Sequence, residues 1–439
     1  MDIFAVLATI ALLIALIVWL KLHPFLAFLV ASIFAGFSLG IEPAAIPSAI
    51  EQGIGNTLGA LVVIVCLGAM FGKLIAETGA AQKIAQSLIQ LCGKRYMTWA
   101  LMLTGFIVGI PLFYNVGFVL LVPLVFSVVY RSGLPAVYLG IPLLAALSVT
   151  HGFLPPHPSP TAMVPMFNAD IGKTLLLGLV VAVPTMILAG PVFASQLKHI
   201  KAEPLKTFIP KEQDASSLPG GWNCFITALL PVVLIASSTV LPGLAPSPET
   251  ENLLQFASHP LVVMLLALAL ASYTLGIRRG VGIATLMSYY SEAIKDIALI
   301  VLIVAGAGAL KQVFVISGVS DTLAAMIDGA DLNPLLLGWL MATLIRICLG
   351  SATVAGLTAA GIMAPIVATT GVDPNLMILA IGAGSLMCSH VNDSGFWMYK
   401  EYFNLSLRQT LLSWTVMESI VGVVGIIAVL TLNSVLHTL

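Results

Sequence analysis

The chain has 439 residues, of which 59% are hydrophobic and 8% are charged, and its formal net charge is −1. Soluble domains carry about 25% charged residues, so this composition excludes an ordinary soluble domain. The small net charge also excludes a basic field for binding nucleic acid, and no nucleic-acid partner is expected. We predict an all-α polytopic membrane protein whose main partner is the lipid bilayer.

Apolar windows recur along the chain, many of them close to the 20 or so residues that a membrane helix needs, and several are interrupted or too short to span. The windows fall at residues 2–20, 23–40, 57–76, 97–129, 136–150, 172–195, 222–243, 259–277, 294–316, 333–349, 352–370, 375–389 and 410–435. The first window has Asp2 rather than lysines ahead of it and lacks an A-x-A cleavage site, so we expect a retained transmembrane helix. The five cysteines follow no metal-ligand spacing, and we expect neither a metal nor a cofactor.

A charged stretch divides the chain into a first half at 1–195, a cytoplasmic linker at 196–221 and a second half at 222–439. Landmark residues recur 239 positions apart, namely Ala85 with Ala324, Pro135 with Pro374, and His151 with His390. This spacing predicts a tandem duplication. Each half is expected to hold scaffold helices, one hairpin (97–130 or 333–370) and one broken helix (136–170 or 375–405).

The positive charges predict how the halves are oriented, because lysines and arginines in short loops stay cytoplasmic. Placing them on one side requires an odd number of crossings between the repeats and makes 97–130 a re-entrant hairpin. The repeats are then inverted, as in secondary transporters with broken helices near the midplane. Lys173, which this scheme places outside, is an exception.

The segment THGFLPPHPSPTA at residues 150–162 follows an apolar run and contains four prolines. Proline removes backbone hydrogen bonds, which a membrane tolerates only where the chain is buried in protein or lines a cavity. We therefore expect a helix break here. The predicted binding side chains at this break are His151, His157, Ser159 and Thr161. The alternative is a proline kink with histidines satisfied inside the bundle.

The repeat mate, CSHVNDSGFWMY at residues 388–399, predicts a second helix break. It offers His390 and Asn392 as binding residues and Asp393 as a residue that couples transport to an ion. Two breaks at equivalent positions of the two halves indicate a transport site between them.

Two glycine-rich stretches, GIPLFYNVG at 109–117 and GSATVAGLTAAG at 350–361, are typical of hairpin tips. Helix N-termini at such tips offer free N–H groups and a positive dipole end to an anion, so a carboxylate substrate suits them. Asn115, Gly117, Ser351 and Thr353 are the predicted binding residues. The alternative is that the small residues serve only helix packing.

Ionisable residues at membrane depth are expensive and usually functional. Arg346 is predicted to bind the substrate carboxylate, and the alternative is an ion pair within the scaffold. His151 is a second coupling candidate beside Asp393, because histidine titrates near neutrality. Glu418 is expected at a helix end or at the membrane interface.

Together, the motifs GFVLLVPLVF, LSVTHGFLPPHPSPTA, FNADIGKTLL, LGSATVAGLTAAGI and SHVNDSGFWMYKEYFNLS resemble the gluconate permease family of bacterial gluconate:proton symporters. The resemblance implies the fold of the ion transporter superfamily, elevator-type alternating access and a homodimer. It also implies import of gluconate or a similar sugar acid with a proton across the bacterial inner membrane. Many members carry a carboxylate where this chain has Asn115, and an amide cannot take up a proton at physiological pH.

Other functions are left as alternatives. A transporter of another small hydroxy acid or of an amino acid such as D-serine, coupled either to protons or to sodium, fits the same polar residues. An intramembrane zinc hydrolase is disfavoured because no H-E-x-x-H motif is present. A channel is disfavoured because no ring of like charge and no filter-like motif appears.

Overall fold

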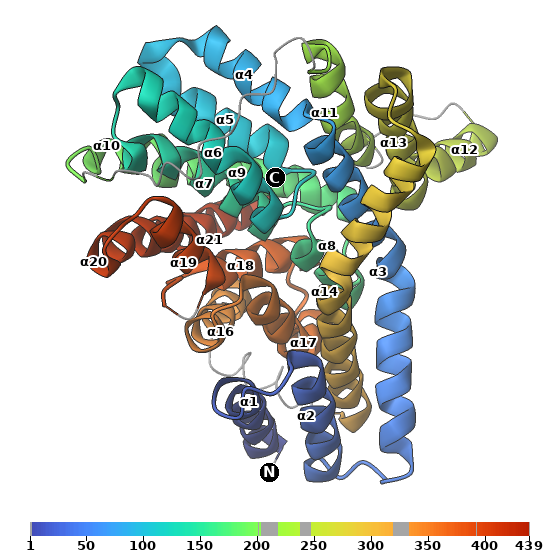
Figure 1. The fold of residues 1–439 in the computed structure, drawn as a ribbon. Coiled ribbons are helices and arrows are strands. Elements are labelled where there is room, and N and C mark those ends of the chain that lie inside the picture. Colours follow the sequence, from blue (N-terminus) through green and yellow to red (C-terminus); the bar gives the residue numbers. More distant parts are fainter. Residues whose placement is uncertain are drawn as a thin grey trace.

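The computed structural model describes residues 2–200, 202, 218–237, 247–318, 333–391 and 393–438, which form helices and no strand (Figure 1). Most of the predicted linker at 196–221, the landmark Ala324 and Asn392 lie outside the described residues. The helices of the first half are α1 (Asp2–Val18), α2 (Pro24–Ser38), α3 (Ala45–Glu77), α4 (Ala80–Cys92), α5 (Met97–Gly109), α6 (Tyr114–Ser132), α7 (Ala136–Phe153), α8 (Pro158–Phe167), α9 (Ile171–Ile187) and α10 (Phe193–Gln196). Those of the second half are α11 (Gly221–Ser237), α12 (Pro248–Ser258), α13 (Pro260–Ala271), α14 (Ile283–Ser317), α16 (Pro334–Leu349), α17 (Ala352–Thr370), α18 (Pro374–Leu386), α19 (Ser394–Tyr402), α20 (Leu407–Thr410) and α21 (Val416–Thr438), with the π-helical turn η8 (Leu411–Thr415) joining α20 to α21.

Several of these helices can cross a membrane. In the part of the chain that the structure describes, six helical segments are long and apolar enough, and α3 makes a seventh if its two halves, bent by 44°, form one span. A helix satisfies its own backbone hydrogen bonds and is therefore suited to lipid. The predicted all-α polytopic fold is confirmed.

The order of helices recurs in the two halves. Helices α3 and α14 begin at Ala45 and Ile283, 238 residues apart, and the same separation relates the starts of α7 and α18, Ala136 and Pro374. The predicted hairpins correspond to α5 with α6 and to α16 with α17. The predicted broken helices correspond to α7 with α8 and to α18 with α19.

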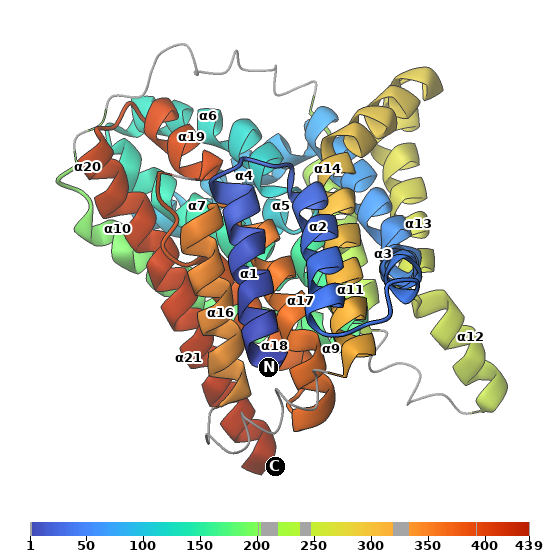
Figure 2. The same ribbon diagram turned by 90° about the horizontal axis from the view of Figure 1, so that it is seen from below.

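Long helix α14 packs lengthwise against both α2 and α3 (Figure 1). Gly53 of α3 and Gly308 of α14 meet at the crossing, where a Cβ on Gly53 would lie 2.4 Å from the Gly308 carbonyl oxygen. A Cβ on Gly308 would lie 2.6 Å from the Gly53 carbonyl oxygen. Small residues permit such backbone contact between membrane helices. Figure 2 shows α1 between α2 and α16 beside this group.

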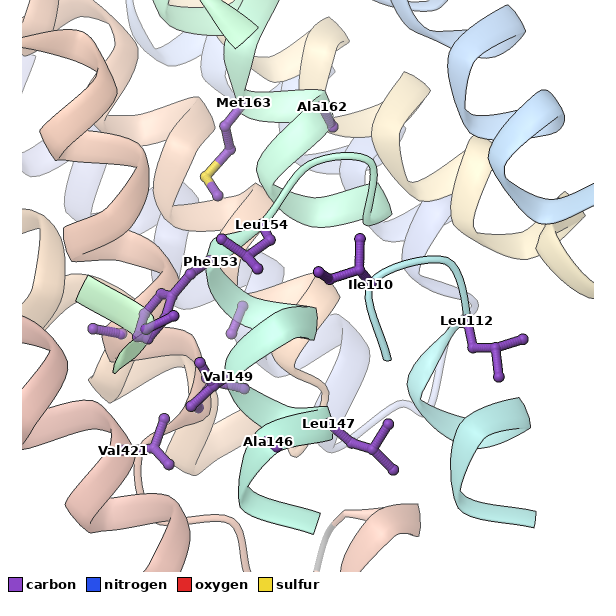
Figure 3. Close-up of a cluster of buried hydrophobic side chains, with 14 of the residues drawn as sticks. Ile110, Leu112, Ala146, Leu147, Val149, Phe153, Leu154, Ala162, Met163 and Val421 are labelled. Carbon is purple, nitrogen blue, oxygen red and sulfur yellow. The ribbon is translucent and has the colours of Figure 1, made fainter. Parts of the chain in front are cut away.

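Local sequence explains the first helix break. Helix α7 ends at Phe153, and α8 begins at Pro158, a first helical position where proline fits because it lacks an N–H and has a suitable φ. Figure 3 shows Phe153 and Leu154 at the end of α7 and Met163 on α8 within one hydrophobic cluster. All three side chains are fully buried, so the non-helical segment between the helices is held inside protein.

Lys173, the exception to the charge pattern, is ion-paired. Its Nζ lies 2.7 Å from a carboxylate oxygen of Asp373, in the loop before α18. Burial alone would raise the pKa of Asp373, but hydrogen bonds from Lys173 and Asn375 outweigh it and hold the pKa below its ordinary value of 3.8. The pair therefore joins the two halves at the N-termini of α9 and α18.

Replacing Lys173 by glutamine is expected to lower the melting temperature slightly, by about 1 °C, because the pair is partly exposed. A carboxyl with a depressed folded pKa contributes stability above its unfolded pKa and loses it as the pH falls through the folded pKa. The difference from the wild type should thus exist at neutral pH and disappear in acid below 3.8. Thermal unfolding of detergent-purified protein over a pH series measures it, and a difference independent of pH would contradict the assignment.

Candidate substrate-binding cavity

A cavity of about 310 Å³ lies where several helix ends converge. Its lining includes the first residues of α6, α17 and α19, the last turns of α7 and α16, and residues of η8 and α21. The N-terminal N–H groups of a helix have no partner within the helix, and its dipole favours negative charge. The volume is at the lower end of the range of about 300–1,000 Å³ for small-molecule sites.

The turn from α16 to α17 forms one wall of the cavity. Gly350 ends α16 with φ at 76°, a left-handed conformation that glycine adopts without steric strain. Ser351 then caps α17 by accepting a hydrogen bond from the Val354 N–H at 3.3 Å. Thr353 lies two residues further, in the first turn of α17, and also lines the cavity. The predicted binding residues Ser351 and Thr353 therefore border one space.

Arg346 connects this turn to the second helix break. One terminal nitrogen lies 2.5 Å from a carboxylate oxygen of Asp393, and the other donates to the Gly350 carbonyl oxygen. The arginine side chain is 3% exposed, and its Nε–H has no partner among the described residues. The structure thus brings both predicted charged residues to the cavity, as an ion pair.

Asp393 is held by further donors. It caps α19 by accepting from the Gly395 N–H at 2.9 Å, and the Ser389 hydroxyl donates to the oxygen that faces Arg346. The Trp414 indole N–H donates in turn to the Ser389 oxygen at 2.7 Å. Each contact of Asp393 thus comes from a donor, which suits an ionised carboxylate.

The two histidines of the first break lie together, with ring centroids 5.5 Å apart. His157 Nε2 is 2.8 Å from the Gly109 carbonyl oxygen, which can only accept, so Nε2 carries the proton. His151 Nε2 is 3.5 Å from the Thr353 hydroxyl, and His151 lines the cavity. The Nδ1 atoms of both rings have no hydrogen-bond partner in the described part of the chain.

Other predicted residues lie away from the cavity. Ser159 and Thr161 are buried, and their hydroxyls find no partner among the described side chains and backbone groups. His390 Nε2 is 3.1 Å from the Ile347 carbonyl oxygen. Gly117 serves packing, since a Cβ there would lie 3.0 Å from a methyl carbon of Leu147.

The structure does not describe the side chains of two predicted binding residues. Asn115 stands in the first turn of α6, but its side chain lies outside the described part of the structure. Asn392, in the second break, lies wholly outside the described residues.

Glu418 lies in the first turn of α21, a helix end as expected, but it is buried and not at an exposed interface. This residue is 2% exposed and lines the cavity from α21, and both of its carboxylate oxygens lie 2.8 Å from the Ser148 hydroxyl of α7. The sequence did contain a sign of this position, because Glu418 is an acid inside the apolar window 410–435. The limits of that window did not show how deep in the membrane the residue lies. Tyr114 was also missed; its hydroxyl is buried without a partner among the described residues.

Comparison with known families agrees with the motifs. The family model described as "GntP family permease" matches residues 1–436. The Gnt-II system L-idonate transporter of Escherichia coli (strain K12) is 46% identical over 439 residues, covering 100% of both chains. A high-affinity gluconate transporter of the same strain is 44% identical, covering 97% of this chain and 98% of the relative. The gluconate permease of Pseudomonas aeruginosa is 43% identical, covering 98% and 97%.

Solved structures show the same fold at lower identity. The YdaH transporter of Alcanivorax borkumensis superposes with a TM-score of 0.68 at 16% identity, covering 94% of this chain and 98% of that one. MtrF of Neisseria gonorrhoeae, whose structure is described as illuminating a class of antimetabolite efflux pumps, gives 0.57 at 14% identity, with 87% and 82% covered. The arrangement of helices is therefore one that transporters use.

Proposed function

Because the chain belongs to the GntP permease family, we propose that it is a secondary active transporter that imports gluconate or a similar sugar acid by proton symport. Membership makes it a multi-pass bacterial membrane protein and a permease, not an enzyme. The names of relatives 46% and 44% identical, an L-idonate and a gluconate transporter, support a sugar acid as the substrate.

The observation that carries the proposal is the buried Arg346 guanidinium at a cavity lined by helix N-termini. A guanidinium is always charged and matches the geometry of a carboxylate. The unpaired Nε–H of Arg346 and the first N–H groups of α6 and α17 are donors for the substrate carboxylate. We assign the carboxylate of the sugar acid to this end of the cavity.

Neutral polar groups line the remaining cavity and suit the hydroxyl groups of the substrate. They are the hydroxyls of Ser351, Thr353 and Tyr114 and the imidazole of His151. A site that hydrogen-bonds substrate hydroxyls rejects an analogue that lacks them, because its own buried polar groups are then left unpaired. We propose that these side chains select a polyhydroxy acid over a simple carboxylate.

The predicted alternating access remains part of the proposal. The hairpins and broken helices would move as one transport unit against a scaffold that includes α3 and α14, in a homodimer. The close contact of Gly53 with Gly308 supports a rigid scaffold.

Uptake into proteoliposomes tests the function. An inward proton gradient should drive accumulation of labelled gluconate, and a protonophore should abolish it. Unlabelled L-idonate should compete, whereas D-serine should not. Uptake driven only by a sodium gradient, or competition by D-serine alone, would replace the proposal by the alternative of a sodium-coupled or amino acid transporter.

We propose that Asp393 contributes to coupling as the fixed counter-ion of Arg346. The substrate carboxylate must replace Asp393 as the partner of Arg346 when it binds. Asp393→Asn is expected to reduce gradient-driven accumulation by about tenfold or more, since it removes a close charged partner. Exchange of internal for external gluconate should persist, because the amide oxygen still accepts from Arg346. Accumulation at the wild-type level by a well-folded variant would remove Asp393 from coupling.

A further inference from the structure

We propose that Glu418 carries the coupled proton, with Ser148 as the partner that accommodates both of its protonation states. This inference rests on the proposed proton symport and names the group that performs it. It also explains how a chain with Asn115 at the tip of α6 could still move protons.

Glu418 lies at a suitable depth. Residues 407–436 form a helical segment that can span the membrane, and Glu418 is 11 residues from its start. At 1.5 Å per residue the segment is about 44 Å long and Glu418 lies about 16 Å from its start, so a hydrocarbon core of about 30 Å centred on the segment would hold Glu418 about 10 Å inside its edge. A carboxylate at this depth is costly and is a functional candidate by default.

Among the charged side chains that line the cavity, no cation forms an ion pair with Glu418. Two carboxylates, Asp393 and Glu418, and one guanidinium, Arg346, line the same cavity. Arg346 is in contact with Asp393, whereas the hydrogen bonds of Glu418 come from the Ser148 hydroxyl. A bound sugar acid adds a further negative charge. Protonating Glu418 offsets that charge, so substrate and proton bind most favourably together.

Ser148 suits a group that gains and loses a proton. A hydroxyl is both donor and acceptor, so it donates to an ionised Glu418 and accepts from the O–H of a protonated one. Asp393 also has a hydroxyl partner, Ser389, but that hydroxyl already accepts from the Trp414 indole N–H, and the other partners, Arg346 and the Gly395 N–H, can only donate. A protonated Asp393 would therefore have an O–H that points at groups that donate and finds no free acceptor. A protonated Glu418 can donate its O–H to Ser148, so only the direction of one hydrogen bond changes.

The helices packed against α21 bring few other ionisable groups to Glu418. Helix α7 contributes His151 to the cavity and carries Tyr138 near its start, α16 contributes Arg346, and Lys173 of α9 is paired with Asp373. Helix α18 and turn η8 carry no ionisable residue in their described sequence. Tyr114 and Asp393 face the cavity from α6 and from the loop before α19.

The proton follows a simple path in this scheme. From the outer side, a hydronium ion gives its proton to one oxygen of Glu418, forming an O–H that donates to Ser148. The sugar acid anion binds beside Arg346, and the loaded site then opens to the inner side. There the anion leaves, and the O–H of Glu418 returns its proton to water.

Glu418→Gln is the decisive variant, since the amide keeps the shape and cannot release a proton. We expect proton-driven accumulation of gluconate to fall by about tenfold or more, while exchange stays within about threefold and becomes independent of pH across about pH 5 to 8. Glu249→Gln, the same change at an exposed glutamate on α12, is the matched control and should keep both the accumulation and the pH-dependent exchange rate of the wild type. Wild-type accumulation by Glu418→Gln, or a pH-dependent exchange rate, would overturn the proposal.

The assay separates this proposal from the function itself. If the wild type shows no proton-driven gluconate uptake, the proposed function fails regardless of Glu418. Should Glu418→Gln not fold, Ser148→Ala provides the second test: the pH midpoint of uptake should shift by about half a unit or more, because one hydrogen bond to Glu418 is lost. An unchanged midpoint in Ser148→Ala overturns the assignment.

Discussion

Arg346→Ala is expected to abolish gluconate uptake and to weaken gluconate binding by about 30-fold or more. Removing one partner of a buried, hydrogen-bonded charge pair costs about 2–5 kcal/mol, and each 1.4 kcal/mol is about tenfold in affinity. Arg346 is 3% exposed and lines the cavity, so its charge acts there without full solvent screening. Isothermal titration and proteoliposome uptake measure the two effects.

A second variant separates substrate binding from structural damage. Arg346→Ala alone leaves Asp393 as a buried, unpaired charge, which is itself destabilising. The double variant Arg346→Ala with Asp393→Ala removes that charge and should regain thermal stability without regaining binding. Arg408→Ala is the matched control, because Arg408 is an exposed arginine on α20.

The double variant also shows which outcome would contradict the proposed binding of the substrate carboxylate by Arg346. If the double variant binds gluconate as tightly as the wild type, Arg346 serves only to neutralise Asp393. Arg346→Lys refines the result, since it keeps the charge but loses the planar fork, and we expect intermediate binding.

Local chemistry made much of this fold predictable. Prolines 155, 156, 158 and 160 are incompatible with an uninterrupted helix, and the structure ends α7 before them and starts α8 at Pro158. Gly350 and Ser351 together signal the end of one helix and the cap of the next, which is what α16 and α17 show. Composition alone indicated the membrane.

Contacts between distant segments were not predictable. Arg346 and Asp393 are 47 positions apart, and their pairing depends on how the α16–α17 turn docks against the second helix break. From the sequence, Arg346 could either form an ion pair within the protein or bind the substrate carboxylate. Nothing in the sequence identified Asp393 as its ion-pair partner.

Contacts between distant segments also decide where Glu418 and Ser159 lie, so the positions of these two residues could not be predicted either. The sequence alone does not show which face of its helix an acid inside an apolar window occupies, and the partner of Glu418, Ser148, lies 270 positions away. Ser159 lies beside the first helix break, yet it packs against α17, where a Cβ on Gly356 would be 2.8 Å from its hydroxyl oxygen. Proximity in sequence to a break does not determine whether a side chain reaches the cavity, and the residues that line it do not include any of α8.

Gly53→Val is expected to prevent stable assembly of α3 with α14. Its Cβ would lie 2.4 Å from the Gly308 carbonyl oxygen and 2.9 Å from the Cα of Ala309, and backbone atoms cannot move aside as a side chain can. Overpacking costs about 1–3 kcal/mol where side chains can adjust, so we expect a loss above about 3 kcal/mol here. Size-exclusion chromatography and thermal unfolding in detergent should show little folded protein.

Gly55→Val is the matched control, because it introduces the same side chain two positions along α3, where nothing lies within 4 Å of the new Cβ. Both variants carry the same change in helix propensity, so that effect cancels in the comparison. Near-wild-type stability of Gly55→Val with collapse of Gly53→Val would locate the cost in the α3–α14 contact. Equal stability of the two variants would mean that the helices can separate at Gly53 without penalty, and the rigid scaffold on which the proposed transport motion depends would then have to lie elsewhere.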